Sequence, residues 1–351
     1  MIGRKRIEFK KESIKATFVE PKGRLVEKII EVRINPLTFR SCRITYSRID
    51  EKEAGAETFP EPPNFALDTS RCPFCRPRVS EMTPTLIAEK FPSERLRLGE
   101  SILFPNLFPY GSHSAVSLFD QNHFVEIGSA SIPAYVDSFK NSVRYLSHVL
   151  NQDPAAVYMA ITQNHLPSAG GSLLHPHLQI NADSIPGNHH RFFEKRCLQY
   201  FQDNQAMLFS DYLDFELKQQ ERYIGTTGDW HWISAFAPEG FFEIWGILPG
   251  VTSFQALSDN QMAMLCHGIL SAQKFYRSLN RNGYNLGVLC IEKADSCLEL
   301  RVVLIVRSNY APWVRNDHTG FELMLGDMAT FTAPEVTASL ARPFWSTDKK
   351  V

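Results

Sequence analysis

The chain has 351 residues, of which 44% are hydrophobic and 21% charged, and its 37 basic and 38 acidic side chains give a formal net charge of -1. This balance is typical of a globular protein with apolar residues enough for two domain-sized cores. A chain this close to neutral has no general attraction for nucleic acid, so any phosphate it binds must bind at a local site.

No run of the sequence approaches the roughly 18 consecutive apolar residues of a membrane span, and the basic N-terminal segment is not followed by the apolar stretch of a signal peptide. We therefore expect a cytoplasmic protein that binds neither a membrane nor nucleic acid. The alternative, nucleic-acid binding through the basic side chains at the N-terminus, is weaker because such a run is usually a solvated surface. Those side chains are Arg4, Lys5, Arg6, Lys10 and Lys11.

The first half of the chain predicts an α+β unit. A turn at Asn35-Pro36 precedes a strand, and two apolar runs within 101–127 predict paired strands. A helix is expected over 137–150, where apolar residues recur on one face, and a buried strand follows over 155–164.

The second half repeats this order weakly. Ser258 and Gln261 have the spacing of a capping box, which predicts a helix start between two pairs of strands. We therefore predict an α+β fold of two halves, residues 1–195 and 196–351, each a mostly antiparallel sheet with packed helices. The strands expected in the second half cover 230–236, 241–248, 284–292 and 298–307.

Cys72 and Cys75 are the one close pair among seven cysteines. Their C-x-x-C spacing is typical of half a tetrahedral zinc site. A redox dithiol and two idle thiols are the alternatives, although a redox pair normally opens a helix and the neighbouring prolines do not favour one. Imidazoles would complete a zinc site, with His175 as the first candidate and His113 as the second.

The segment from Asn164 to Gln179 contains the densest chemistry. In an extended chain His175, His177 and Gln179 share one face, while the flanking leucines face the other way. Such side chains on an apolar strand need a ligand, a metal or solvent, although an isolated His pair is usually just a hydrogen-bonded structural pair. The small residues over 168–172 could bring backbone N–H groups close to a phosphate, next to an imidazole that can act as a nucleophile.

These motifs together resemble the galactose-1-phosphate uridylyltransferases, a branch of the histidine-triad superfamily. The matching segments run in order through residues 33–180. They are an R-x-N-P-L-T stretch at Arg33–Thr38, the C-x-x-C pair, Pro105-Asn106-Leu107-Phe108-Pro109 and the G-x-S-x-x-H-P-H-x-Q signature that ends at Gln179.

The resemblance implies two histidine-triad-like halves, the second a degenerate repeat, and a role for each matched residue. His177 would attack UDP-glucose and form a covalent uridylyl-histidine, which a second sugar 1-phosphate would then take up, with Gln179 bound to the α-phosphate. Substrate would also contact Arg48, Asn106, Asn164, Gly170, Gly171 and Ser172. Zinc would be structural, with Cys72, Cys75 and His175 as ligands. The resemblance also implies a homodimer.

The sequence departs from the family pattern in three places. Asn164-His165-Leu166 stands where the family has N-x-G, and the family's third metal-binding histidine aligns near Ser131. The further ligand is therefore left open between His113, Ser131 and water. In addition, the strand over 298–303 lacks the H-x-H pair with which the family often binds a second metal.

Three readings of function stay open. The first is a nucleotidyltransferase that moves a nucleoside monophosphate, with UMP favoured, between sugar 1-phosphates as part of galactose metabolism. A phosphorylase of the ADP-glucose type would use the same His177 and Gln179. The third is a non-catalytic nucleotide- or zinc-binding relative. Gln179 favours transfer, because histidine-triad hydrolases typically carry a third histidine at that position.

Overall fold

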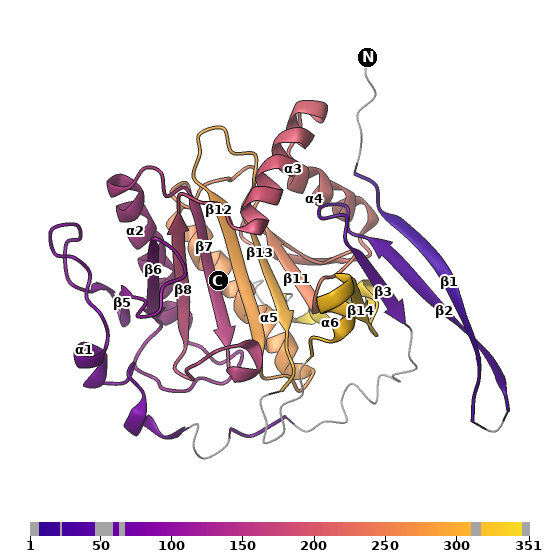
Figure 1. Cartoon of the computed structure of the whole chain (residues 1–351), viewed down its shortest axis with the longest axis horizontal. Coiled ribbons are helices and arrows are strands. Elements are labelled where there is room, and N and C mark those ends of the chain that lie inside the picture. Colours follow the sequence, from indigo (N-terminus) through magenta and orange to yellow (C-terminus); the bar gives the residue numbers. More distant parts are fainter. Residues whose placement is uncertain (1–6, 22, 46–58, 63–66, 310–316, 346–351) are drawn as a thin grey trace.

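A ten-stranded antiparallel sheet forms the centre of the computed structural model, which describes residues 7–21, 23–45, 59–62, 67–309 and 317–345 (Figure 1). In spatial order its strands are β4 (Leu96–Leu98), β5 (Ser101–Pro105), β6 (His113–Leu118), β8 (His177–Asp183), β7 (Tyr158–His165), β12 (Tyr284–Ile291), β13 (Arg301–Val306), β11 (Phe241–Ile247), β10 (Trp230–Ser234) and β9 (Tyr223–Thr227).

The sheet consists of two halves with the same chain order. The first half runs from β4 to β6, through helix α2 (Ile132–Gln152), to β7 and β8, and the second runs from β9 to β11, through α5 (Asp259–Ser278), to β12 and β13. In each half the last strand lies between the third and the fourth, and the two fourth strands, β7 and β12, pair at the centre. The predicted α+β fold of two related halves is confirmed.

The predicted boundary after residue 195 falls within helix α3 (Asn188–Asn204), which begins the connection between the two halves. Because one sheet runs through both halves, the division into residues 1–195 and 196–351 stays a prediction.

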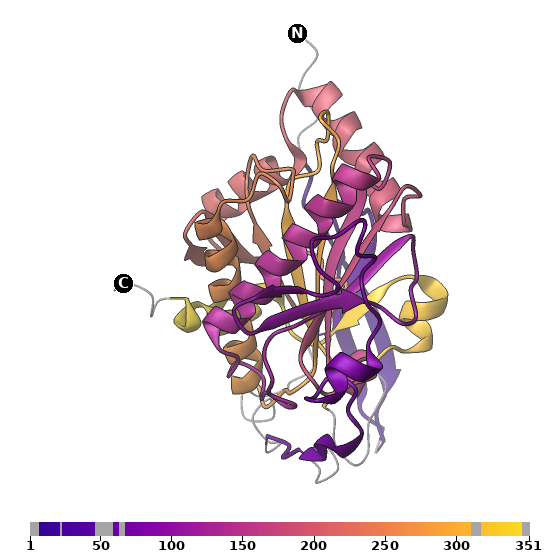
Figure 2. The same cartoon turned by 90° about the vertical axis from the view of Figure 1, so that its left-hand side faces the viewer.

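Helices α2 and α5 lie side by side on one face of the sheet (Figures 1 and 2). Alternate strand residues such as Ile161, Leu178 and Val302 are buried under these helices in the largest apolar core. The predicted capping box at the start of α5 is confirmed, since Ser258 Oγ accepts from the backbone N–H of Gln261 and the Gln261 side chain accepts in return. The alternation of the strands sends the intervening polar residues to the opposite face.

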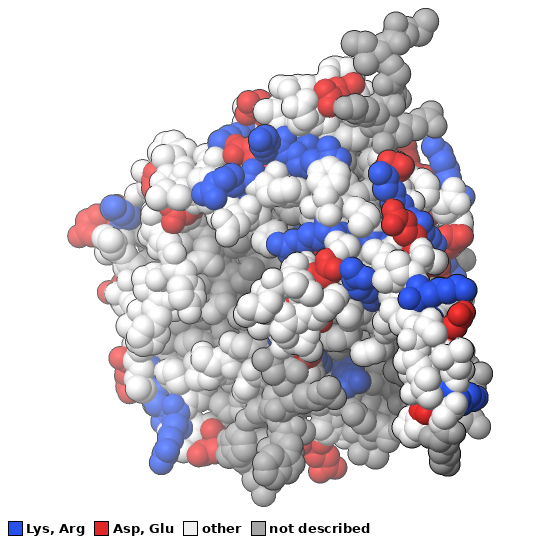
Figure 3. Space-filling model, turned by 45° about the vertical axis from the view of Figure 1, so that its right-hand side comes forward, with Lys and Arg blue, Asp and Glu red and all other residues white. Residues whose placement is uncertain are grey.

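That opposite face is covered by different elements at its two ends. Helices α3 and α4 (Leu208–Gln219) pack on the second half, and the short helix α1 (Arg78–Met82), with the C-x-x-C turn, packs on β5 and β6. The polar residues of β7, β8 and β12 lie between these two covered regions. Figure 3 shows a hollow on this side of the molecule, with basic and acidic side chains interspersed beside it.

A second, four-stranded sheet lies beside the second half, and two of its strands project from the molecule as a long hairpin (Figure 1). Its strands are β1 (Lys10–Val19), β2 (Leu25–Ile34), β3 (Ser41–Thr45) and the parallel β14 (Met328–Thr330). The last described α-helix, α6 (Pro334–Ala341), packs between this sheet and the strands β9 to β11. Within the described ranges, every helix is too short or too polar to span a lipid bilayer.

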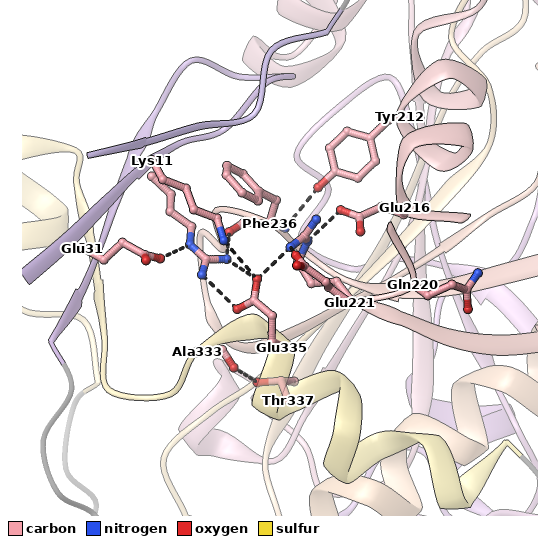
Figure 4. A network of polar contacts seen from close by, with 12 residues as sticks. Lys11, Glu31, Tyr212, Glu216, Gln220, Glu221, Phe236, Ala333, Glu335 and Thr337 are labelled. Carbon is pink, nitrogen blue, oxygen red and sulfur yellow. Dashed lines mark hydrogen bonds and ion pairs between the residues drawn. The ribbon is translucent and has the colours of Figure 1, made fainter. Parts of the chain in front are cut away.

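A buried ionic network ties the hairpin to the second half (Figure 4). Both oxygens of Glu335, at the start of α6, accept hydrogen bonds from Arg33 at 2.9 Å, and Arg222 donates to one of them at 2.7 Å. Both arginine side chains are 1% exposed. Arg33 begins the R-x-N-P-L-T stretch. In that stretch Asn35 Oδ1 accepts from the backbone N–H groups of Leu37 and Thr38 and so closes the predicted turn. The R-x-N-P-L-T stretch is thus a structural anchor.

Candidate active site and metal centre

A tight turn connects the end of β7 to the start of β8. Leu166, Gly170 and Gly171 shape it: Leu166 and Gly170 adopt positive φ angles of 71° and 83°, and a Cβ on Gly171 would lie 2.9 Å from the carbonyl oxygen of Asn164. The last contact is too close for any side chain, so the turn requires glycine at position 171.

The turn uses its own backbone donors, contrary to what the sequence predicts. The N–H groups of Ala169 and Gly171 donate to the carbonyl of Leu166, and that of Gly170 donates to Pro167, all at 3.0 Å. These three N–H groups therefore do not form a phosphate cradle. The Ser168 hydroxyl, in contrast, is buried and has no hydrogen-bond partner among the described residues.

His177 is the first residue of β8 and is held in one orientation. Its Nδ1 donates to the backbone carbonyl of His175 at 2.8 Å, which leaves Nε2 as the nitrogen with the free lone pair. The ring of Phe74 lies edge-on against it at 5.4 Å. Burial lowers the pKa of His177, although its hydrogen bond to His175 works in the opposite direction. The imidazole is thus kept neutral and oriented, as a nucleophile requires.

Gln179 lies on the same face as His177, as predicted, and begins a chain of hydrogen bonds that crosses the junction of the two halves. Asn164 donates to Gln179 Oε1 at 3.3 Å and accepts from Asn285 at 2.7 Å. Arg307 donates to Asn285 at 2.8 Å and is itself paired with Asp317. Because the Gln179 carbonyl oxygen is occupied, its NH₂ group is directed elsewhere and has no partner among the described residues.

Asn285 and Arg307 were not predicted from the sequence. Asn285 lies in an apolar strand and faces away from the α2–α5 core. The rule that singled out His177 and Gln179, a polar side chain on one face of an apolar strand, could also have singled out Asn285.

Four residues form a cluster whose ligand atoms all lie within 4.8 Å of one another: Cys72, Cys75, His123 and His175. Cys75 Sγ is 3.3 Å from His123 Nδ1 and 3.6 Å from His175 Nδ1. His175 Nε2 donates to the carbonyl of Asp120 at 3.0 Å, which leaves Nδ1 free to bind a metal ion. Two sulfur and two nitrogen ligands at such distances suit a tetrahedral metal ion.

His113 is not part of this cluster, although it was the second predicted ligand. Its Nε2 is instead 2.9 Å from a carboxylate oxygen of Asp153. The strand that contains His113 runs antiparallel to β8 and pairs it with Ala182, at the far end from His177. Ser131, the other residue considered, begins α2 as its N-cap.

His123 takes the place in the cluster that the sequence left open between His113, Ser131 and water. The prediction extended the second strand to Ile127, but β6 ends at Leu118 and His123 lies in the following loop. The sequence carried no direct signal for it, because His123 lies 48 residues from Cys75 along the chain and only the fold brings the two together.

The remaining residues predicted to contact substrate are Asn106, Ser172 and Arg48. Asn106 follows β5, and its side chain accepts from the backbone N–H of Phe108 at 3.1 Å. Ser172 is exposed in the turn before His175. Arg48 lies outside the described residues.

No protein-family model matches the sequence. An uncharacterised protein of Archaeoglobus fulgidus is 28% identical over 342 residues, which are 97% of this chain and 99% of that protein. An ADP-glucose phosphorylase from Arabidopsis thaliana, solved with bound ADP-glucose, has a TM-score of 0.69 at 20% identity and covers 89% of this chain and 98% of its own.

Two further structures agree. A GalT-like protein from Arabidopsis thaliana has a TM-score of 0.66 at 19% identity, over 89% of this chain and 98% of its own. A uridylyltransferase has a TM-score of 0.65 at 15% identity, over 91% of this chain and 99% of its own. This chain has the galactose-1-phosphate uridylyltransferase fold. The resemblance read from the motifs therefore holds for the fold, and in this chain the G-x-S-x-x-H-P-H-x-Q signature ends on β8.

Proposed function

We propose that this protein is a nucleotidyltransferase or phosphorylase that acts on a nucleoside diphosphate sugar through a covalent nucleotidyl-His177. The single observation that carries the proposal is the hydrogen bond from His177 Nδ1 to the carbonyl of His175. This bond leaves Nε2 as a neutral nucleophile on the face that also carries Gln179. The similarity of the fold to that of an ADP-glucose phosphorylase and of a uridylyltransferase supports it.

In the first step Nε2 of His177 would attack the α-phosphorus of the sugar nucleotide. A P–N bond forms, the P–O bond to the sugar phosphate breaks, and sugar 1-phosphate leaves with the bonding electron pair. In the second step an oxygen of a new sugar 1-phosphate, or of inorganic phosphate, attacks the same phosphorus and releases the imidazole. The Nδ1–H stays bonded to the carbonyl of His175 and stabilises the positive charge that the ring carries in between.

Gln179 would donate its NH₂ group to an oxygen of the α-phosphate. Its position depends on Asn164, which occupies the Gln179 carbonyl oxygen, and on Asn285, which holds Asn164. A neutral donor aimed at the phosphoryl group stabilises charge that develops as the phosphorus is attacked, and it adds no charge that would trap the product.

Cys72, Cys75, His123 and His175 would hold a structural zinc ion. Zinc would supply no reacting group there and would fix the segment that precedes β8. Because His175 provides both a ligand nitrogen and the carbonyl that orients His177, zinc would keep the nucleophile in place.

Labelling with radioactive UDP-glucose and ADP-glucose tests this function and identifies the base. The wild-type protein should form an acid-labile, base-stable adduct with one of them, and addition of galactose 1-phosphate or inorganic phosphate should then release it. His177→Asn should form no adduct, whereas the matched control His113→Asn should label like the wild type.

UDP-glucose with a hexose 1-phosphate as acceptor is the pair that the resemblance favours. Release by inorganic phosphate alone would instead identify a phosphorylase. Absence of label with both nucleotides, or equal labelling of His177→Asn, would contradict covalent catalysis and leave a non-catalytic binding protein.

A further inference from the structure

Arg301 occupies in the second half the position that His177 occupies in the first. Leu118, the last residue of β6, pairs with His177, the first residue of β8. In the same way Ile247, the last residue of β11, pairs with Arg301, the first residue of β13. Both side chains point away from the layer of α2 and α5, so the repeated fold builds two equivalent places on one face.

The guanidinium of Arg301 lies against three aromatic rings. Its central carbon is 4.3 Å from the ring centre of Trp245, 4.9 Å from that of Phe209 and 5.2 Å from that of Phe193. Stacking of this kind uses the face of the guanidinium and leaves the N–H groups at its edge free to donate. Within the described part of the chain, no hydrogen bond or ion pair reaches these N–H groups.

A cavity of about 320 Å³ opens beside Arg301. Its other lining residues come from β11 to β13, from α3 and α4 and from the loops next to them, and most of them are apolar. The polar ones include His189, Glu239, Glu243, Asn285 and Glu299. A cavity of this size suits a small metabolite.

The carboxylates that line the cavity have partners other than Arg301. Glu299 accepts from the backbone N–H groups of Ser210 and Gly250 at 2.8 and 2.7 Å. Glu239 accepts from Asn35 and Arg40, both at 3.2 Å.

Glu243 accepts from the indole N–H of Trp245 and from the backbone N–H of Glu239. Burial raises its pKa to about 7, so the negative charge that it offers to Arg301 is reduced. Arg301 is therefore a cation at a cavity wall whose neighbouring carboxylates are already bound to other groups.

We propose that this cavity is a second ligand site, in which Arg301 binds the carboxylate or phosphate group of a small organic anion. A guanidinium edge pairs with such groups through two parallel hydrogen bonds, and the apolar walls would hold the body of the ligand. Where the first half has a nucleophile, the second half has an anion-binding arginine. This inference does not depend on the proposed covalent chemistry at His177.

Asn285 lies between the candidate active site and the cavity at Arg301, since it lines the cavity and also donates to Asn164. Between His177 and the cavity the sheet carries the side chains of Asn164 and Asn285, so the second site is adjacent to the first and separate from it. A ligand at Arg301 should accordingly bind whether or not His177 is intact.

Isothermal titration with inorganic phosphate, glucose 1-phosphate and succinate tests the proposal on the full chain. At least one of these anions should bind the wild type. Arg301→Met keeps much of the apolar bulk and should weaken that anion about tenfold or more, because a charge-assisted bidentate pair is lost. Arg301→Lys keeps the charge without the fork and should give an intermediate affinity.

His177→Asn is the matched control and should bind the same anion with an unchanged dissociation constant. The proposal is overturned if none of the three anions binds, if Arg301→Met binds as tightly as the wild type, or if His177→Asn loses the binding. The last result would assign the anion to the first site. If Arg301→Met does not fold, as judged by near-ultraviolet circular dichroism, an unchanged affinity of Arg301→Lys overturns it equally.

Discussion

The backbone carbonyl oxygen of His175 lies 2.8 Å from Nδ1 of His177, while the side chain of His175 lies 3.6 Å from the sulfur of Cys75. One residue thus contacts both the cysteine–histidine cluster and the candidate nucleophile. The orientation of His177 is therefore coupled to the geometry of the cluster, and loss of a cluster residue should change the orientation of the His177 ring.

Loss of a cluster ligand should lower both metal content and activity. His123→Ala removes one of four ligands, so the purified variant should retain much less zinc than the wild type after dialysis against a chelator, as measured by plasma emission spectroscopy. His113→Ala, which removes a histidine outside the cluster, should keep its zinc. Equal zinc in both variants would exclude His123 as a ligand.

Gln179→Ala should lower the rate of transfer from the sugar nucleotide that labels His177. Loss of one donor to a developing negative charge typically costs about 10²–10³ in kcat. Stopped-flow or quench measurement of adduct formation isolates that step. A rate within twofold of the wild type would mean that Gln179 does not contact the phosphate.

Asn285→Ala should act on the same step more weakly, because Asn285 positions Gln179 through Asn164. We expect about a tenfold fall in kcat with little change in KM. Asn151→Ala, at the exposed end of α2, is the matched control and should have wild-type kinetics. A change confined to KM would instead indicate direct contact with the substrate.

Gly171→Ala should destabilise the turn before β8. The new Cβ would lie 2.9 Å from the carbonyl oxygen of Asn164 and 3.0 Å from that of Leu166, and both are backbone atoms that cannot rotate away. We expect a loss of about 1–3 kcal/mol in the free energy of unfolding, measured by urea titration. Gly320→Ala, where a Cβ meets nothing within 4 Å, should leave stability unchanged. Equal stability of the two variants would show that the turn can relax.

Glu335 should make the stability of the protein depend on pH in acid. Burial works to raise the pKa of its carboxyl, but the hydrogen bonds and the charge of Arg33, together with a hydrogen bond from Arg222, hold that pKa at about 2. A carboxyl whose folded-state pKa is depressed stabilises the fold above its unfolded pKa, near 4.5, and loses that contribution as the pH falls towards 2.

Glu335→Gln should accordingly lower the free energy of unfolding at pH 7 by an amount on the order of 3 kcal/mol. The difference between wild type and variant should shrink as urea titrations are repeated from pH 5 down to pH 3. A difference that stays constant over this range would contradict the ionic role of Glu335.

Local patterns predicted the central sheet well. The apolar periodicity of 137–150 identified α2, and the spacing of Ser258 and Gln261 identified the start of α5, because caps and helix faces depend on residues close in the sequence. The strands β7 and β10 to β13 were likewise expected near their observed bounds. The hairpin of β1 and β2 was not predicted, since its strands are rich in charged residues and many of its side chains are exposed.

The sequence by itself determined the α+β fold of two halves, the C-x-x-C pair and the shared face of His177 and Gln179, because each follows from the spacing of neighbouring residues along an extended or helical backbone. Only the tertiary structure decided three features. His123 completes the cysteine–histidine cluster, the N–H groups of the turn before β8 form hydrogen bonds within the turn, and Asn285 positions Gln179 through Asn164. The first and the third depend on the loop after β6 and on the pairing of β7 with β12, which bring together residues far apart in the chain. The hydrogen bonds of the turn join residues within 166–171 and depend instead on the backbone conformation that this segment adopts in the folded chain.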